Sequence, residues 1–278
     1  MIKDNSNPVP QSKIESDLRK LGLKSGDLVL CHSSLSSIGW VIGGPIAVID
    51  AIINVTGVKR NLGAEDGEEG TIIMPAHSGD YSNPAYWTNP SVPNSWVNMI
   101  NNNMPPYRRD ITPVKKTIGV IPECFRKYPG VERSSHPVRS FCALGRDAVS
   151  IVTKDSYDHP HGKNSALDYI YQNKGKILNI GVKNNTCFAF SEHLTSIQHD
   201  IIVEQSPIQQ DGSRTLVEWK QLDYNYTSDD RDKVHKSFIS ESENCKLGMV
   251  GTAESVVFDA YEYIEYSKEW LSAKYNKK

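Results

Sequence analysis

The sequence has no apolar run that approaches the roughly 20 residues needed to cross a bilayer. Residues 1–11 are polar and contain proline, so they lack the apolar segment of a secretory signal peptide. Basic residues form no block and the formal net charge is -2, which disfavours nucleic acid as a partner. These absences predict a cytoplasmic protein with neither membrane nor nucleic-acid partners.

Cysteine is scarce and dispersed, with five residues and no C-x-x-C pair. An odd, scattered set in apolar surroundings is typical of buried thiols in a reducing compartment. Metal-binding patterns are equally weak, because the run Asp158–Gly162 has two histidines and no second ligand pair at zinc spacing. We therefore expect packing thiols, no metal, and solvent-facing or supporting roles for His159 and His161.

What is present is the composition of a soluble globular protein, with 38% hydrophobic and 23% charged residues in a chain of 278. Apolar runs and helical periodicities alternate along it, and Ser12 with Glu15 resembles a capping box. We expect an α/β fold, with a mixed central sheet flanked by helices in a single large domain over 1–278. A polar surface insertion is expected at 57–70 and a long functional loop at 76–112. The expected strands are 28–30, 71–75, 141–144 and 176–181, and the expected helices are 12–21, 47–55, 118–128, 165–171, 186–195 and 261–271.

The most informative segment is 31–44, which follows a buried strand and precedes a helix. It contains four serines and three glycines. Free backbone N–H groups at such a turn bind anions, and glycine lets a ligand approach the backbone. The spacing matches neither G-x-x-x-x-G-K-[ST] nor G-x-G-x-x-G. This segment therefore predicts a site for another phosphorylated or amide-bearing ligand.

Three residues have side chains suited to proton transfer or helix capping. His136 precedes a proline, so it is expected in extended backbone with its imidazole projecting from a strand edge. Thr186 lies at the start of an expected helix, where capping is its simplest role. Glu192 is flanked by apolar residues, and burial would raise its pKa unless a protonated partner such as His136 lowers it. A structural histidine and a helix cap stay open as alternatives to catalysis.

Several blocks occur in a fixed order between about Gly26 and Leu271. They are His32–Trp40, Gly70–Pro75, Asn89–Pro93, Met104-Pro105 with Thr112-Pro113, Arg133–Pro137, Thr186–Glu192 and Gly248–Ala253. With these blocks the chain resembles the aminoglycoside 3-N-acetyltransferase family, whose members transfer an acetyl group from acetyl-CoA to an antibiotic amine and act in antibiotic resistance.

The resemblance implies roles for residues at matching positions. It implies that CoA is bound by His32, Ser33, Ser34, Leu35, Ser36, Ser37, Thr112, Lys115, Lys116 and Ser140. For a polycationic acceptor it implies carboxylates and aromatic faces, for which the candidates are Asp80, Tyr81, Trp87, Trp96 and Glu204. Transfer would be direct, with His136 as general base, Glu192 orienting it, and Thr186 or a backbone N–H stabilising the oxyanion.

Two departures from the family pattern affect the acceptor side. Ala189 stands where the family usually has a histidine, three positions before the glutamate, and Ala166 stands where it has a proline. His193 or His159 would be the available substitutes. Two further readings therefore stay open beside an aminoglycoside enzyme: an acetyltransferase for another small-molecule amine, and a CoA-binding protein that has lost catalysis. The sequence does not decide between a monomer and a homodimer.

Overall fold

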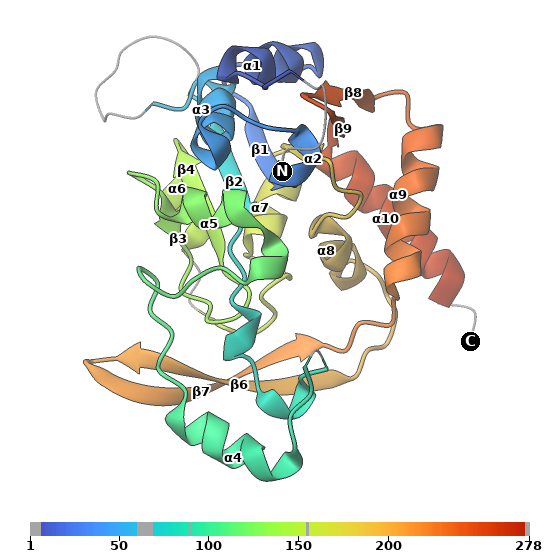
Figure 1. Cartoon of the computed structure of the whole chain (residues 1–278). Coiled ribbons are helices and arrows are strands. Elements are labelled where there is room, and N and C mark those ends of the chain that lie inside the picture. Colours follow the sequence, from blue (N-terminus) through green and yellow to red (C-terminus); the bar gives the residue numbers. More distant parts are fainter. Residues whose placement is uncertain (1–6, 60–68, 89, 154–155, 276–278) are drawn as a thin grey trace.

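The computed structural model describes residues 7–59, 69–88, 90–153 and 156–275, and it has the expected α/β architecture (Figure 1). These residues form a seven-stranded sheet in the order β3-β4-β2-β1-β5-β9-β8. The three central strands β2, β1 and β5 are parallel, and the outer strands are antiparallel to their neighbours. The strands are β1 (Leu28–Ser33), β2 (Thr71–Pro75), β3 (Glu132–Arg133), β4 (Phe141–Gly145), β5 (Lys176–Ile180), β8 (Lys246–Val250) and β9 (Ala253–Asp259).

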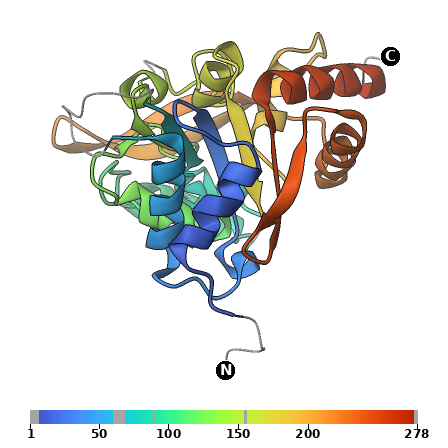
Figure 2. The same cartoon turned by 90° about the horizontal axis from the view of Figure 1, so that it is seen from above.

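Helices cover both faces of the sheet, as the view along another axis shows (Figure 2). One face carries α1 (Gln11–Lys20), α3 (Gly44–Thr56) and α5 (Val120–Arg126), and the other carries α6 (Ala148–Val152), α7 (Ala166–Gln172), α8 (Cys187–His193), α9 (Ser228–Glu241) and α10 (Ala260–Tyr275). Alternate residues of β1 enter the two hydrophobic clusters, Val29 on the first face and Leu30 on the second. Because both faces are buried, the central strands have the continuous apolar runs found in the sequence.

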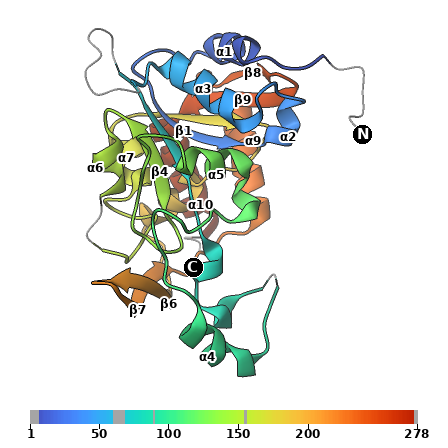
Figure 3. The ribbon, with the colours of Figure 1, turned by 60° about the vertical axis from the view of Figure 1, so that its left-hand side comes forward.

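A second, smaller layer lies beyond one end of the sheet (Figure 1 and Figure 3). It consists of the hairpin β6 (Ile201–Gln210) and β7 (Ser213–Leu222) with α4 (Asn94–Asn103). Glu204 accepts a hydrogen bond from the N–H of Asn83 at 2.9 Å, and Arg214 Nε donates to the carbonyl of Met104 at 3.0 Å. The hairpin and the segment 76–112 therefore support each other.

The structure differs from the sequence expectations in that segment and at the first helix. Segment 76–112 contains α4 and the 3₁₀ turns η1 (Gly79–Tyr81) and η2 (Pro84–Tyr86). No residue of α4 is buried, although Trp96, Met99 and Ile100 recur at helical spacing along it. The expected Ser12 capping box is wrong, because α1 begins at Gln11 after Pro10 and has no side-chain cap. Residues 60–68 of the expected surface insertion lie outside the described residues.

Within the described ranges, no helix is both long and apolar enough to span a membrane. All five cysteines are free thiols: Cys31, Cys142 and Cys187 are buried, and Cys124 and Cys245 are partly buried. The expectation of packing thiols is therefore confirmed.

Candidate active site

The carboxyl ends of the parallel strands β2, β1 and β5 meet at one edge of the sheet. His77 lies just past β2, His32 lies near the end of β1, and Thr186 follows β5 as the N-cap of α8. His32 Nε2 accepts a hydrogen bond from the N–H of Thr186 at 3.1 Å and lies 3.2 Å from the Thr186 hydroxyl. Ligands of α/β proteins bind at this edge, so these side chains mark the candidate site.

The hydrogen bond from Thr186 fixes the tautomer of His32. Because Nε2 accepts the bond, the ring proton is on Nδ1, which is buried and has no hydrogen-bond partner. Burial lowers the pKa of His32 to about 3, so the ring is neutral at neutral pH. A buried N–H donor without a partner is suited to stabilise a developing negative charge on oxygen. The N–H of Thr186 is therefore already engaged by His32.

Two further imidazoles lie beside each other close to His32. The ring centroids of His77 and His161 are 5.6 Å apart, and the Nε2 atom of each is buried and without a hydrogen-bond partner. Burial, then the positive charge of Arg139, hold the pKa of both histidines well below the usual range. Both rings are therefore neutral near pH 7, and each can accept or donate one proton.

Tyr224 connects this group to a fourth histidine. Its hydroxyl lies 3.1 Å from His193 Nε2 and 3.4 Å from His161 Nδ1. We refer to His32, His77, His161, His193 and Tyr224 together as the histidine chamber. Of the two roles expected for His161 from the sequence, the solvent-facing one is wrong, because its side chain is only 6% exposed, and the supporting one stays a prediction. The signal that could have found His77 is its place two residues past the end of the buried strand β2, at the same sheet edge as His32 near the end of β1.

Both ring nitrogens of His136 lie within hydrogen-bond distance of backbone groups. Its Nδ1 accepts hydrogen bonds from the N–H groups of Val138 and Arg139 at 3.1 and 2.9 Å, and its Nε2 is 3.1 Å from the carbonyl of Tyr157. The ring is thus a neutral Nε2–H tautomer whose lone pair is taken by the backbone. His136 therefore caps the turn that leads to β4. The catalytic role expected from the sequence stays a prediction.

Glu192 has partners other than His136. Its Oε1 accepts a hydrogen bond from the N–H of Asn225 at 3.0 Å and lies 3.6 Å from His199 Nδ1. Burial raises the pKa of Glu192 to about 7, and its Oε2 is buried without a hydrogen-bond partner. The expectation of a buried carboxyl with a raised pKa is met, whereas the pairing with His136 is replaced by a pairing with His199.

A cavity of about 740 Å³ lies against the serine-rich segment at the end of β1. The Oγ of Ser33 is buried without a partner, and Ser37 Oγ donates to Ser34 Oγ at 2.9 Å. Hydroxyls therefore alternate with apolar groups along its wall, as the amides and methylenes of a pantetheine chain require. The lining includes Ser33, Ser34, Leu35, Ser36, Trp40, Val41, Ile118, Val120 and Val182.

Both lysines expected at a phosphate lie near this cavity, in different environments. Lys116 is exposed at the start of the 3₁₀ turn η3 (Lys116–Ile118), whose next two residues, Thr117 and Ile118, line the cavity. Lys115 pairs with Asp80 at 3.1 Å, so a residue expected to bind donor and a residue expected to bind acceptor neutralise each other.

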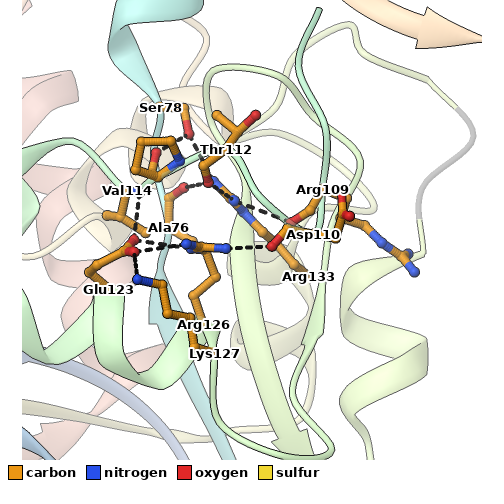
Figure 4. Close-up of polar contacts among 11 residues, drawn as sticks. Ala76, Ser78, Arg109, Asp110, Thr112, Val114, Glu123, Arg126, Lys127 and Arg133 are labelled. Carbon is orange, nitrogen blue, oxygen red and sulfur yellow. Dashed lines mark hydrogen bonds and ion pairs between the residues drawn. The ribbon is translucent and has the colours of Figure 1, made fainter.

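Thr112 belongs to a buried polar network (Figure 4), which Ser140 also joins, and neither residue lines the cavity. The guanidinium of Arg133 donates to the carbonyls of Ala76 and Thr112 at 2.7 and 2.5 Å. Its Nε donates to Ser140 Oγ at 3.1 Å, and Ser140 Oγ donates to the carbonyl of Ala76 at 2.7 Å. Ala76 directly precedes His77, so this network positions the histidine chamber and makes no contact with the cavity.

The other residues expected to bind the acceptor lie in the smaller layer and its connecting segment. Tyr81 contacts Tyr107 edge-on at 6.1 Å, and Trp87 Nε1 donates to Ser82 Oγ at 3.0 Å. Trp96 on α4 is 55% exposed. Glu204 is buried, which raises its pKa, and it is engaged by the backbone of the supporting segment. Among the described residues, no group of three or more His, Cys, Asp or Glu could hold a metal ion.

Comparison with known proteins gives one consistent result. The profile of the aminoglycoside 3-N-acetyltransferase family matches residues 30–272. The SPbeta prophage-derived aminoglycoside N(3')-acetyltransferase-like protein YokD of Bacillus subtilis is 37% identical over 98% of this chain and 95% of its own length. Its crystal structure superposes with a TM-score of 0.89 at 36% identity, covering 98% of this chain and 97% of that one.

Two other similar solved structures are described as ligand complexes. AAC-VIa bound to sisomicin has a TM-score of 0.83 at 27% identity, covering 97% of this chain and 99% of that one. AAC-IIIb, described as a binary complex with CoASH, has a TM-score of 0.84 at 24% identity and shares the fold over 98% and 99% of the two chains. The match of sequence and fold over nearly the whole length shows that this chain belongs to the aminoglycoside 3-N-acetyltransferase family.

Proposed function

We propose that this protein transfers the acetyl group of acetyl-CoA to the 3-amino group of an aminoglycoside. The observation that carries the proposal is a hydroxyl-lined cavity at the same strand edge as buried, neutral imidazoles. Family membership supports the reaction, and relatives bound to CoASH and to sisomicin support the donor and the acceptor. When bound, acetyl-CoA supplies a thioester carbonyl as the electrophile.

In this proposal His161 Nε2 is the general base. An ammonium group cannot attack, so a neutral imidazole must take a proton from the acceptor nitrogen. His161 is buried, neutral and has an unpartnered Nε2, which meets that need. Nδ1–H of His32 stabilises the oxyanion, and Thr186 holds His32 in the donating tautomer. The described cysteines are buried or partly buried free thiols whose pKa is raised by burial, so direct transfer is favoured over a covalent acyl-enzyme.

In this proposal the segment 33–37 and Lys116 bind acetyl-CoA, and the smaller layer binds the aminoglycoside. Ser33, Ser34 and Ser36 would bond the pantetheine amides, with Leu35 against its methylenes. Tyr81, Trp87 and Trp96 would present aromatic faces to the acceptor.

The first experiment measures acetyl-CoA-dependent thiol release with sisomicin, with gentamicin and with sisomicin already acetylated at its 3-amino group. We expect release with the two free amines and none with the blocked one. The matched variant is His161→Asn, which should lower kcat at least about a hundredfold while CoA still raises the melting temperature. Equal release with the blocked amine, or none with any aminoglycoside, would contradict the proposal.

One observation favours a second candidate, an acceptor amine that carries an anionic group. The Nε of Arg139 is buried without a hydrogen-bond partner, and its charge acts on His77, His161 and Glu204. A fixed cation beside the chamber attracts an anion and repels a polycation. Release with an aminoalkyl phosphonate or an amino acid, but not with aminoglycosides, would identify this second function.

A further inference from the structure

We propose that Tyr224 is the central member of a proton relay that carries the acceptor's proton from His161 to His193. This inference rests on the proposed acetyl transfer, because it supplies the exit for the proton that the base removes. It gives a role to Tyr224, which neither the sequence analysis nor the proposed acetyl transfer has used.

The three side chains form an unbroken hydrogen-bonded path. His161 Nδ1 lies 3.4 Å from the Tyr224 hydroxyl, which lies 3.1 Å from His193 Nε2. The ring of Tyr224 is stacked on His161 and meets His193 edge-on. The remaining nitrogen of His161, Nε2, is buried and unpartnered, so the path begins at the atom that would receive the proton.

The relay assigns the resting protons as follows. The Tyr224 hydroxyl has one proton to donate, and in the proposed arrangement it donates to His193 Nε2 across the 3.1 Å contact. The Tyr224 oxygen then accepts from His161 Nδ1–H, which leaves the lone pair of His161 on Nε2. The resting arrangement is therefore the one in which His161 can act as a base.

Each transfer along the path balances. The acceptor N–H bond breaks as His161 Nε2–H forms, His161 Nδ1–H breaks as a new Tyr224 O–H forms, and the former Tyr224 O–H breaks as His193 Nε2–H forms. His161 and Tyr224 end neutral, and the positive charge lies on His193. Burial raises the pKa of the Tyr224 phenol, so Tyr224 passes a proton on without ionising.

The two ends of the path differ in how well they tolerate positive charge. His161 is buried beside the cation Arg139, and both its burial and that positive charge disfavour an imidazolium. His193 is only partly buried and lies in the last turn of α8, where the helix dipole favours a cation. The relay therefore moves charge from an unfavourable site to a favourable one nearer solvent.

The loop before α7 fixes the position of the receiving ring. A Cβ built on Gly162 would lie 3.0 Å from His193 Nδ1, so the backbone at Gly162 packs directly against the imidazole. His159 meets the same ring edge-on at 5.8 Å. The two histidines of the run 158–162 thus serve the two ends of the path, His161 as the start and His159 as support for the end.

The test compares Tyr224→Phe with Tyr226→Phe, a matched loss of a hydroxyl from the adjacent tyrosine, which packs on Phe188 and Arg231. We expect Tyr224→Phe to lower kcat by at least about tenfold with the KM for acetyl-CoA unchanged, and Tyr226→Phe to have little effect. The proton inventory in H₂O–D₂O mixtures should be curved for the wild-type enzyme and linear for Tyr224→Phe. Adding His193→Gln to Tyr224→Phe should cost little more than either change alone.

A second readout does not need activity. Ring ¹⁵N signals of His161 and His193 should both move in Tyr224→Phe and stay in place in Tyr226→Phe. Unmoved signals, or a kcat within about twofold of wild type with an unchanged proton inventory, would overturn the relay. A wild-type protein inactive with every amine would instead contradict the proposed function, and the ¹⁵N result would still decide whether the hydrogen-bonded path exists.

Discussion

At the scale of single residues, two histidines in similar sequence contexts have different hydrogen-bond environments. His136 and His161 each lie next to a proline, and both are buried. The difference is in their hydrogen bonds: backbone groups occupy both nitrogens of His136, whereas Nε2 of His161 is left unpartnered. Sequence alone identifies the residue type suited to proton transfer, but only the hydrogen-bond partners show which histidine is available.

His136→Ala therefore tests a structural role. The change leaves the N–H groups of Val138 and Arg139 without their acceptor, and we expect a loss of about 1–3 kcal/mol in the free energy of unfolding, measured with urea. Under conditions where the variant is folded, its kcat should stay within about tenfold of wild type, in contrast to His161→Asn. A large loss of kcat with unchanged stability would return His136 to the mechanism.

At the scale of elements, helix boundaries differ in how clearly the sequence marks them. Thr227 and Asp230 form a capping box at the start of α9, with bonds of 3.3 and 2.9 Å between side chains and backbone. The same kind of pattern at Ser12 and Glu15 makes no cap, because Pro10 precedes the helix and Glu15 bonds Gln11 and Asn54 instead. A short capping pattern thus depends on where the chain enters the helix, which tertiary contacts decide.

We predict that Thr227→Ala lowers the free energy of unfolding by about 1 kcal/mol, because it removes one of the two capping bonds. Ser12→Ala is the matched control and should change stability by less than about 0.5 kcal/mol. Chemical denaturation at neutral pH measures the free energy of unfolding of both variants. Equal losses in the two variants would show that Ser12 also caps a helix in solution.

The sheet could be predicted better than the surrounding elements. The strands at 71–75, 141–144 and 176–181 carry continuous apolar runs because both faces are buried, and the structure has them within one residue at each end. The hairpin β6–β7 and helix α4 could not be predicted from the sequence pattern, because many of their residues are partly or fully exposed. Those are the elements proposed to bind the acceptor, so the acceptor side is also where residue roles were hardest to assign.

At the scale of the whole molecule, stability is linked to the protonation of Glu192. Folding raises its pKa from 4.5 to about 7, so the protonated form is favoured in the folded state. Its contribution to stability is fully present below pH 4.5 and is lost as the pH rises through 7. Folding of the wild-type protein should therefore be penalised at alkaline pH by this one buried carboxylate.

Glu192→Gln removes that titration while keeping an oxygen for the N–H of Asn225. We expect the variant to be more stable than the wild type by up to about 2 kcal/mol at pH 8.5, with the difference disappearing near pH 4.5. Thermal unfolding across this range measures the difference. A constant difference at all pH values would show that Glu192 does not titrate on folding.

The separation of the central sheet from the β6–β7 layer has an evolutionary consequence. The proposed donor cavity and the histidine chamber lie at strand ends of the main core. The outer layer joins that core through buried residues of the hairpin such as Trp219, whose ring meets His136 edge-on, whereas α4 has no buried residue. Substitutions at the exposed positions of this layer, such as those of α4, should cost little in folding free energy. A lineage with this architecture can therefore exchange one amine for another by changing its periphery, while the catalytic apparatus is inherited intact.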